Sequence, residues 1–200
     1  MTRIVAGRAR GRTLAVPPRG TRPTADRVRE ALFSALEARM DLDGAAVLDL
    51  YAGSGAVGLE SLSRGAAHVL LVENDARAAR VIARNVTTVG LPGAVVRTAT
   101  VAGTVSAPPD REYDLVFADP PYAVSDAEVG TALRRLVDGG WLADDALVVV
   151  ERSSRSPDTA WPSGLSAVKS WTYGEARVDL ARREVERREV ERREVEQSAD

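Results

Sequence analysis

The sequence contains no cysteine, so neither a disulfide framework nor a cysteine-ligated zinc site can form. It also lacks any apolar run near the roughly eighteen residues that a membrane-spanning helix needs, and its arginine-rich beginning has no apolar segment typical of a secretory signal. Two hundred residues suffice for one domain with a self-sufficient core. We therefore expect a soluble cytoplasmic protein with no membrane association and no metal site.

Lysine is nearly absent, because 26 of the 27 basic residues are arginine. The charge is unevenly placed: residues 1–30 sum to +6, whereas the remaining 170 residues sum to −8. A basic segment on an acidic body favours a polyanionic partner, and we predict that this partner is a nucleic acid. Arginine could simply be abundant in this protein, but abundance does not explain the clustering.

The chain alternates between strand-like and helix-like patterns after a short arm. Residues 1–24 place glycines and prolines between short apolar pieces, which predicts a small hairpin or extended arm rather than core. Residues 25–39 repeat apolar side chains at helical spacing, with Thr24 as the expected N-cap. The next expected strands are 46–51, 68–73, 94–99, 113–118 and 145–151, and the expected helices are 56–64, 75–89 and 126–137. This alternation predicts a Rossmann-like α/β domain with helices on both faces of a parallel sheet.

The end of the chain departs from this alternation. A loop is expected at 152–164, and strands at 165–173 and 175–182 should close a mostly parallel seven-stranded sheet as an antiparallel pair. Beyond them Arg-Arg-Glu-Val-Glu occurs three times, and valines spaced by five residues make no apolar stripe on a helix. We therefore divide the chain into an arm at 1–24, a main domain at 25–182 and a solvated or disordered tail at 183–200.

The most informative motif is Asp119-Pro120-Pro121-Tyr122, which directly follows the apolar run 115–118. A nucleobase amine is a poor nucleophile because its lone pair is delocalised into the ring. A carboxylate beside a rigid backbone carbonyl can hold the two amine protons and free that pair for attack. Tyr122 offers an aromatic face on which a base removed from its stack can lie. The motif predicts amino-methylation of a base, although the same residues also suit an ordinary loop after a strand.

A glycine-rich loop follows the strand at 46–51 and leads into a helix, which is typical of a loop that approaches a cofactor. Gly53, Gly55 and Gly58 also satisfy the dinucleotide fingerprint, and Glu73 ends the next expected strand, where ribose hydroxyls are bound. Asp49 favours S-adenosylmethionine over NAD, because a carboxylate suits an ammonium and a sulfonium better than a pyrophosphate.

Several segments together resemble the bacterial small-subunit ribosomal RNA guanine-N2 methyltransferases of the RsmD type, over roughly residues 3–182. The resemblance rests on Arg3 to Gly7, Arg22-Pro23-Thr24 with Asp26 to Glu30, Leu48 to Ala66, Val116 to Tyr122, and Gly140-Trp141-Leu142. The first two segments are more specific than the glycine loop, which class I methyltransferases share widely.

The resemblance implies a class I methyltransferase fold with a basic N-terminal β-hairpin extension and S-adenosylmethionine as cofactor. The implied reaction is methylation of N2 of one guanine in 16S ribosomal RNA, of the guanine-966 type, within a 30S particle or its precursor. We expect a monomer. The expected cofactor residues are Asp49, Tyr51, Ala52, Gly53, Ser54, Gly55, Gly58, Glu73, Asn74 and Thr100, and the expected catalytic residues are Asp119, Pro120, Pro121 and Tyr122. The expected RNA contacts are Arg3, Arg8, Arg10, Arg12, Arg19, Arg22 and Thr24.

One departure from the family concerns the adenine of the cofactor. Many relatives carry an asparagine or aspartate after the strand at 94–99, whereas this chain continues Ala99-Thr100, so Thr100 or a backbone group is expected to replace that contact. Three alternatives stay open: a DNA adenine or cytosine amino-methyltransferase, a non-catalytic ribosome-assembly factor, and an NAD enzyme. No separate DNA-recognition domain is visible in this sequence. The proline motif beside the glycine loop argues against a non-catalytic factor, and Asp49 together with the proline motif, which has no evident task in hydride transfer, argues against an NAD enzyme.

Overall fold

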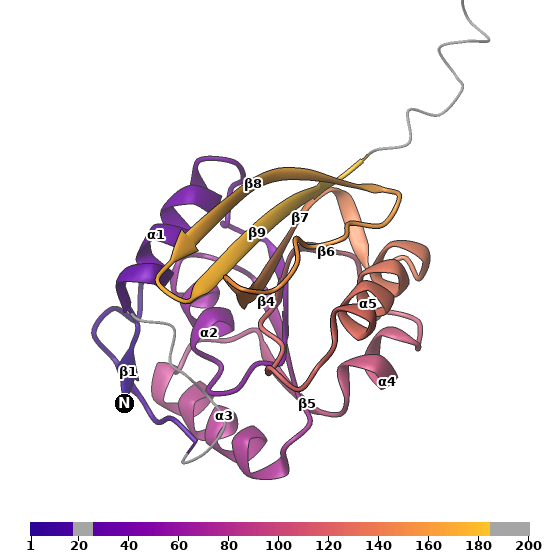
Figure 1. Ribbon diagram of the computed structural model, residues 1–200. Coiled ribbons are helices and arrows are strands. Elements are labelled where there is room, and N and C mark those ends of the chain that lie inside the picture. The colour runs from indigo at the N-terminus through magenta and orange to yellow at the C-terminus, as the bar shows by residue number, and fades with distance from the viewer. Residues whose placement is uncertain (18–25, 185–200) are drawn as a thin grey trace, which may run out of the picture.

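A seven-stranded sheet forms the centre of the molecule, with its strands in the order β5-β4-β3-β6-β7-β9-β8 (Figure 1). The computed structural model describes residues 1–17 and 26–184. The strands of this sheet are β3 (Ala46–Leu50), β4 (His68–Glu73), β5 (Ala94–Thr98), β6 (Tyr113–Ala118), β7 (Leu142–Ser153), β8 (Leu165–Tyr173) and β9 (Ala176–Arg183). β3 to β7 run parallel, and β9 pairs antiparallel with both β7 and β8. The predicted mostly parallel seven-stranded sheet is therefore confirmed.

Helices cover both faces of this sheet. They are α1 (Asp26–Glu37), α2 (Ala56–Ser63), α3 (Ala76–Val89), α4 (Val101–Val105) and α5 (Asp126–Asp138). The helices α1, α2 and α3 lie on one face, and α4 and α5 lie on the other (Figure 1). The chain runs outward from β3 to β5 and then returns to β6, so right-handed crossovers place the two sets of helices on opposite faces.

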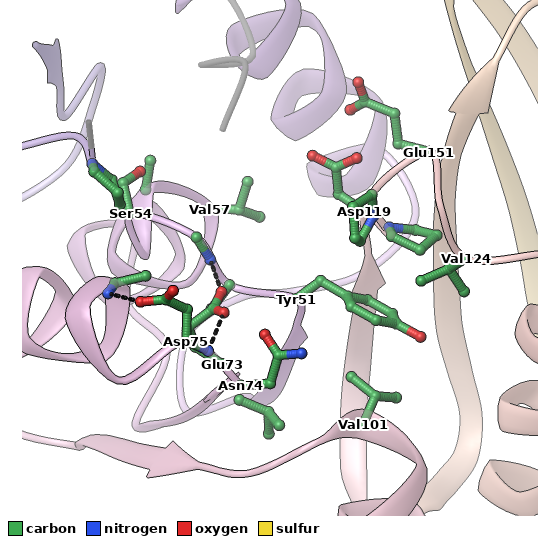
Figure 2. Close-up of a pocket in the computed structure, with 18 of the residues that line it drawn as sticks. Tyr51, Ser54, Val57, Glu73, Asn74, Asp75, Val101, Asp119, Val124 and Glu151 are labelled. Carbon is green, nitrogen blue, oxygen red and sulfur yellow. Dashed lines mark hydrogen bonds between the residues drawn. The ribbon is translucent and has the colours of Figure 1, made fainter. Parts of the chain in front are cut away.

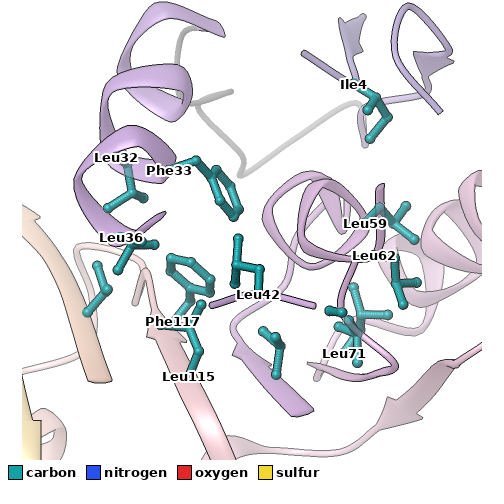
Figure 3. Close-up of a cluster of buried hydrophobic side chains, with 14 of the residues drawn as sticks. Ile4, Leu32, Phe33, Leu36, Leu42, Leu59, Leu62, Leu71, Leu115 and Phe117 are labelled. Atoms are coloured by element: carbon teal, nitrogen blue, oxygen red, sulfur yellow. The ribbon is translucent and has the colours of Figure 1, made fainter. Parts of the chain in front are cut away.

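The central strands are buried on both faces, which explains why they read as continuous apolar runs in the sequence. Successive residues of β6 contribute to two different clusters. Leu115 and Phe117 pack with α1, α2 and α3, whereas Val116 and Ala118 pack with α4 and α5. Figure 3 shows the first cluster, in which the rings of Phe33 and Phe117 lie 5.8 Å apart.

The sequence missed one helix and shortened one strand. α4 was not predicted, because its five residues are too few to show a helical period: they hold one apolar pair at helical spacing, Val101 and Val105, and the Thr100 hydroxyl, which accepts from the Gly103 N–H at 3.0 Å, marks its beginning. β7 was predicted as 145–151. It begins earlier, at Leu142, which pairs with Tyr113 of β6, and it extends to Ser153 because its ladder with β9 continues to the pair Ser153 and Ala176.

The N-terminal arm contains the predicted hairpin pair, β1 (Thr2–Arg3) and β2 (Thr13–Leu14). The expectation that the arm lies outside the core is wrong. Ile4, Ala9 and Leu14 are buried, and they belong to the same cluster as the apolar side chains of α2 (Figure 3). Three apolar residues among glycines and arginines give no periodic signal, so only the surface supplied by α2 reveals them as core.

A glycine allows the arm to dock this closely. Gly7 has a φ of +77°, and a Cβ added to it would lie 1.9 Å from the Ser63 carbonyl oxygen. Directly after Gly7, the Arg8 N–H donates to the Ser63 carbonyl at 2.7 Å and the Ala9 N–H donates to the Ser63 hydroxyl at 2.9 Å. The arm is therefore fixed to the end of α2 by backbone hydrogen bonds.

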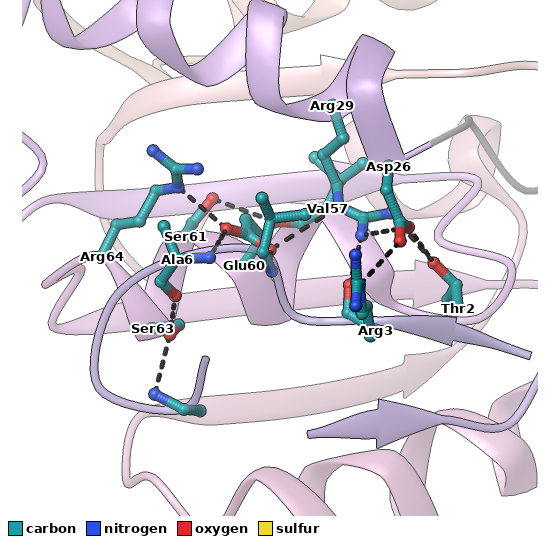
Figure 4. A network of polar contacts seen from close by, with 12 residues as sticks. Thr2, Arg3, Ala6, Asp26, Arg29, Val57, Glu60, Ser61, Ser63 and Arg64 are labelled. Carbon is teal, nitrogen blue, oxygen red and sulfur yellow. Dashed lines mark hydrogen bonds and ion pairs between the residues drawn. The ribbon is translucent and has the colours of Figure 1, made fainter. Parts of the chain in front are cut away.

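A buried carboxylate completes the attachment of the arm (Figure 4). Glu60 of α2 is fully buried, and it accepts hydrogen bonds from the N–H groups of Val5 at 2.7 Å and Ala6 at 2.9 Å. Its remaining partners are Arg64, at 2.9 Å, and the buried Arg29 of α1, at 3.6 Å. A single carboxylate thus joins the arm, α1 and α2.

Some predictions fall on residues outside the described part of the chain. These are Thr24 as N-cap, Arg19, Arg22 and the repeats from residue 185 onward. Among the residues that the structure does describe, no helix is both long and apolar enough to cross a membrane.

Candidate active site

A cavity of about 810 Å³ opens at the C-terminal edge of the parallel strands. Its walls come from the segments that follow β3, β4, β5 and β6, from the end of β7, and from the N-terminal arm through Thr2 and Pro17. The strand order reverses between β3 and β6, and ligands of open α/β sheets bind in the crevice at such a point. The volume is within the roughly 300–1,000 Å³ that is typical of small-molecule sites.

The glycine loop forms one wall through a run of left-handed backbone. Tyr51, Gly53 and Gly55 have φ values of 60°, 59° and 75°. This conformation is costly for a tyrosine, and such costs are concentrated at ligand sites. The loop turns the chain from β3 into α2 and places the backbone of Ala52 and Ser54 against the cavity.

Beneath the loop, Asp49 and Gly58 fix how α2 packs on the sheet. The Gly58 N–H donates to the Asp49 carboxylate at 2.9 Å, and a Cβ on Gly58 would lie 2.8 Å from the Val69 side chain. The pKa of Asp49 is raised to about 7, first of all by burial and in part by the charge of Glu73, against the lowering effect of the Gly58 N–H. A cation bound above the loop would stabilise the charged form of this carboxylate.

Glu73 lies at the end of β4, where it holds two loops together (Figure 2). Its carboxylate accepts from the Gly53 N–H at 2.9 Å and from the Asp75 N–H at 2.9 Å. Asp75 in turn caps α3, with the Arg77 and Ala78 N–H groups at 2.6 and 2.9 Å, and these bonds lower its pKa. Two carboxylates therefore line the cavity in fixed positions beside the glycine loop.

The Asp119-Pro120-Pro121-Tyr122 motif lies across the cavity from Glu73 and Asp75 (Figure 2). The Pro121 carbonyl accepts from the Val124 N–H at 2.9 Å, which closes a turn directly after the motif. Tyr122 is 74% exposed and lines the cavity. The motif therefore places a carboxylate, two prolines and an aromatic residue along one cavity.

The environment of Asp119 favours its protonated form. The residue has exposed surface on the cavity, yet protein atoms surround its carboxylate. Its pKa is raised to about 8 by this burial, first of all, and by the negative charges of Glu151 and Asp49, while Arg152 acts in the lowering direction. Strongly shifted carboxylates in a cavity are typical of functional sites.

The structure brings most of the predicted site residues together. The ones that line the cavity are Tyr51, Ala52, Gly53, Ser54, Glu73, Asn74, Asp119, Pro120, Pro121 and Tyr122. Asp49, Gly55 and Gly58 support the loop from behind, and Thr100 caps α4 while its neighbours Ala99 and Val101 reach the cavity.

Several wall residues were missed by the sequence reasoning. Asp75, Arg29, Glu151 and Arg152 line the cavity, and none of them was predicted as a site residue. Glu151 had a usable signal, because it is the charged residue that ends the apolar strand predicted at 145–151. Arg29 lies in the segment Asp26 to Glu30 that carries part of the family resemblance, but its burial depends on the arm and α2.

Asn85 of α3 connects the arm to the glycine loop. Its side-chain amide accepts from the Ala15 N–H at 2.9 Å and donates to the carbonyls of Ala15 at 2.9 Å and Ser54 at 2.8 Å. Asn85 is only 2% exposed, so these hydrogen bonds have no competition from water. The position of the loop at Ser54 therefore depends on the docked arm.

We expect Asn85→Ala to weaken binding of S-adenosylhomocysteine, the product form of the predicted cofactor, by about tenfold, because the Ser54 carbonyl loses its buried partner. Calorimetric titration measures this change. The control is Thr87→Ala, on the exposed side of the same helix, which should leave the affinity unchanged. Equal affinities of the Asn85 variant and the unmodified protein would contradict the connection.

The arginines of the described arm are exposed, but three of them also make structural contacts. Arg12 donates to the carbonyls of Thr88 at 2.6 Å and Val89 at 2.5 Å, which caps the end of α3. Arg3 pairs with Asp26 at 3.2 Å, and Arg8 donates to the Leu62 carbonyl over a longer distance of 3.4 Å. Arg8, with this single long contact, and Arg10 are therefore the arginines of the described arm that are best placed for phosphate contacts.

The family model described as conserved hypothetical protein 95 matches residues 2–182. Ribosomal RNA small subunit methyltransferase D of Escherichia coli strain K12 is 39% identical over 183 residues, which are 91% of this chain and 90% of that protein. The methyltransferase of the same name from Haemophilus influenzae is 35% identical over 176 residues, 86% of this chain and 89% of that protein.

A solved structure confirms the fold. The yhhF protein of Escherichia coli superposes with a TM-score of 0.81 at 36% identity, over 92% of this chain and 99% of that chain. Together with the methyltransferases above, this likeness confirms the predicted Rossmann-like class I methyltransferase fold.

Proposed function

The chain belongs to the family described as conserved hypothetical protein 95, and from this premise we propose that it methylates the exocyclic N2 amine of one guanine in 16S ribosomal RNA, of the guanine-966 type, using S-adenosylmethionine. One observation carries the proposal: Asp119, with its proline motif, lies in the same cavity as the glycine loop and Glu73. An amine-binding carboxylate and a nucleotide-binding loop thus face one enclosed space.

The residues present suit S-adenosylmethionine. Asp49 supplies a buried negative charge below the loop, Glu73 supplies carboxylate oxygens for ribose hydroxyls, and the backbone near Ala99 can meet the adenine in place of the usual side chain. When bound, the cofactor supplies an electrophilic methyl group on a sulfonium. Thr100 is less suited to the adenine than a backbone group, because its hydroxyl already caps α4.

The residues of the proline motif would hold and activate the base. Asp119 and the Pro120 carbonyl accept the two amine protons, which directs the nitrogen lone pair and stabilises the positive charge that develops on nitrogen. The ring of Tyr122 stacks on the base after it leaves its helix. The methylated nitrogen is acidic, so Asp119 or water can take the released proton without a stronger base. Alignment of the two reacting atoms supplies much of the rate.

The arm is the proposed RNA contact. Exposed arginines on a segment that also forms part of the cavity wall would meet phosphates next to the target base, and such contacts fix register rather than sequence. We further propose that the enzyme acts in the bacterial cytoplasm, as a monomer, on a 30S particle or its precursor. The names of the relatives support the ribosomal RNA substrate.

A labelling experiment tests the proposal. The protein is incubated with methyl-labelled S-adenosylmethionine and, in parallel, with naked 16S RNA, with 30S particles that lack the modification, and with duplex DNA, and the labelled nucleoside is identified after digestion. N2-methylguanosine from either RNA substrate is the expected product. Label in DNA adenine or cytosine would show that DNA, and not ribosomal RNA, is the substrate. If none of the three reactions gave a labelled nucleoside, a non-catalytic assembly factor would be favoured.

A separate prediction concerns how strongly RNA binding through the arm depends on salt concentration. Replacing both Arg8 and Arg10 by alanine should weaken RNA binding and should lower the slope of log Kd against log salt by about 1.5, because two phosphate contacts are lost. Filter binding at several salt concentrations measures the slope. The matched control replaces Arg111 and Arg134, which are exposed arginines outside the arm and the cavity. An unchanged slope in the arm variant would show that RNA is bound elsewhere.

A further inference from the structure

A second carboxylate lies beside the catalytic one. β6 and β7 run parallel with Ala118 paired to Val150, and Asp119 and Glu151 each follow by one residue. Neighbouring strands are about 4.8 Å apart, so the two side chains start from adjacent positions. Both line the cavity, and Figure 2 shows them next to each other.

The neighbouring carboxylate opposes the ionisation of Asp119, the proposed catalytic residue. The charge of Glu151 raises the pKa of Asp119, so it disfavours the ionised form that accepts amine protons best. Arg152 offsets the effect only in part, because its guanidinium is also engaged with Asp126 at 2.7 Å and with the Val124 carbonyl at 3.1 Å. The second carboxylate therefore acts on Asp119 from within the same cavity.

The edges of the three amino-bearing bases differ at the atom next to the amine. In guanine the ring nitrogen N1, beside the N2 amine, carries a hydrogen. In adenine and cytosine the ring nitrogen beside the amine carries a lone pair instead. An ionised carboxylate only accepts hydrogen bonds. Two adjacent carboxylates therefore complement guanine, because one can accept from the N2 amine and the other from the N1 hydrogen. With adenine or cytosine, the second carboxylate would face the lone pair of a ring nitrogen and would be repelled.

We propose that Glu151 selects guanine by accepting the N1 hydrogen of the base while Asp119 accepts a hydrogen of the N2 amine. This inference rests on the proposed function, because it assigns the second contact of the same base. A cavity that pairs with a ring N–H rejects bases that lack this hydrogen, so the contact with Glu151 selects the base inside the cavity itself.

The base analogue 2-aminopurine tests the contact directly, because it keeps the amine of guanine but its N1 carries a lone pair. Ribosomal RNA with either base at the target position is prepared by ligation of synthetic fragments, and methyl transfer from labelled S-adenosylmethionine is measured. We expect the unmodified enzyme to prefer guanine by at least about 100-fold in kcat/KM. Equal values for the two bases would overturn the role of Glu151 and leave the proposed function intact. If the enzyme did not label guanine at all, both the role of Glu151 and the proposed function would be contradicted.

The variant Glu151→Gln supplies a second measurement. An amide can donate to the N1 lone pair of 2-aminopurine, so the preference for guanine should fall to about tenfold or less. Loss of the Glu151 charge also lowers the pKa of Asp119, so the rise of kcat/KM with pH should move to lower pH. The other charges that shift the pKa of Asp119 are Asp49 of β3 and Arg152 of β7, and the variant leaves both unchanged. It also leaves unchanged Arg29 of α1 and Glu73 of β4, which line the same cavity.

A matched control separates selection from general charge effects. Glu112→Gln removes an exposed carboxylate at the opposite end of β6 and should change neither the base preference nor the pH profile. Calorimetry with S-adenosylhomocysteine and thermal melting show whether the Glu151 variant is folded. A folded Glu151 variant that keeps the full preference for guanine and the original pH profile would overturn the inference.

Discussion

Asp119→Ala should lower kcat by a factor of about 100 to 1,000, because it removes the acceptor that stabilises the developing charge on the amine. Cofactor binding should stay nearly unchanged, since the glycine loop, Asp49 and Glu73 do not depend on this side chain. Single-turnover methylation of the RNA substrate measures the first effect, and calorimetric titration with S-adenosylhomocysteine measures the second.

The same variant should not lose stability. The pKa of Asp119 is raised by burial and by neighbouring negative charges, so its charged form is disfavoured in the folded protein. Removing it should leave the melting temperature unchanged or raise it, as is common when a functional residue is replaced. Full methylation by a stable variant would contradict the proposed mechanism.

The pH dependence of the unmodified enzyme follows from the same carboxylate. The ionised form of Asp119 accepts amine protons, and its pKa is raised to about 8, so kcat/KM should rise with pH through about 8 and fall below it. Bound S-adenosylmethionine, which carries positive charge, should move this rise toward lower pH when the cofactor is saturating.

Glu60→Gln should destabilise the protein by about 3 kcal/mol, because it removes one partner of a buried ion pair. The fully buried Glu60 carboxylate accepts from two N–H groups of the arm and pairs with Arg64 and Arg29. Glutamine keeps the shape but turns a donor toward groups that are themselves donors. For a domain of this size, the expected fall in melting temperature is about 10 °C, measurable by scanning calorimetry.

The control for this prediction uses the same arginine. Glu37 pairs with Arg64 at 2.9 Å but is 44% exposed, so Glu37→Gln should cost less than about 1 kcal/mol. If the two variants lost similar amounts of stability, the ion pairs with Arg64 would account for the loss, and the attachment of the arm would contribute nothing to it. Hydrogen exchange of the Val5 and Ala6 amides, which should become faster only in the Glu60 variant, separates these outcomes.

The secondary structure was predictable where a local pattern repeats. β4 and β6 have the predicted bounds, because both are buried on two faces and their apolar residues run together, interrupted in β6 only by Asp114. α4 was not predictable, since its five residues include a glycine and are too few to establish a helical period. The core position of Ile4, Ala9 and Leu14 was missed for a related reason, because their burial is created by α2 and leaves no period in the arm itself.

The sequence by itself determined the chemistry of the site: a carboxylate with two prolines after one apolar strand and a glycine loop after another, each meaningful through residue type and order alone. Only the tertiary structure decided which other groups share that cavity. Parallel register placed Glu151 beside Asp119, and hydrogen bonds between distant segments tied Glu60 and Asn85 to the arm. Such contacts depend on the order of the strands and on how the helices dock, because these bring together residues that are far apart in the sequence and share no regular spacing.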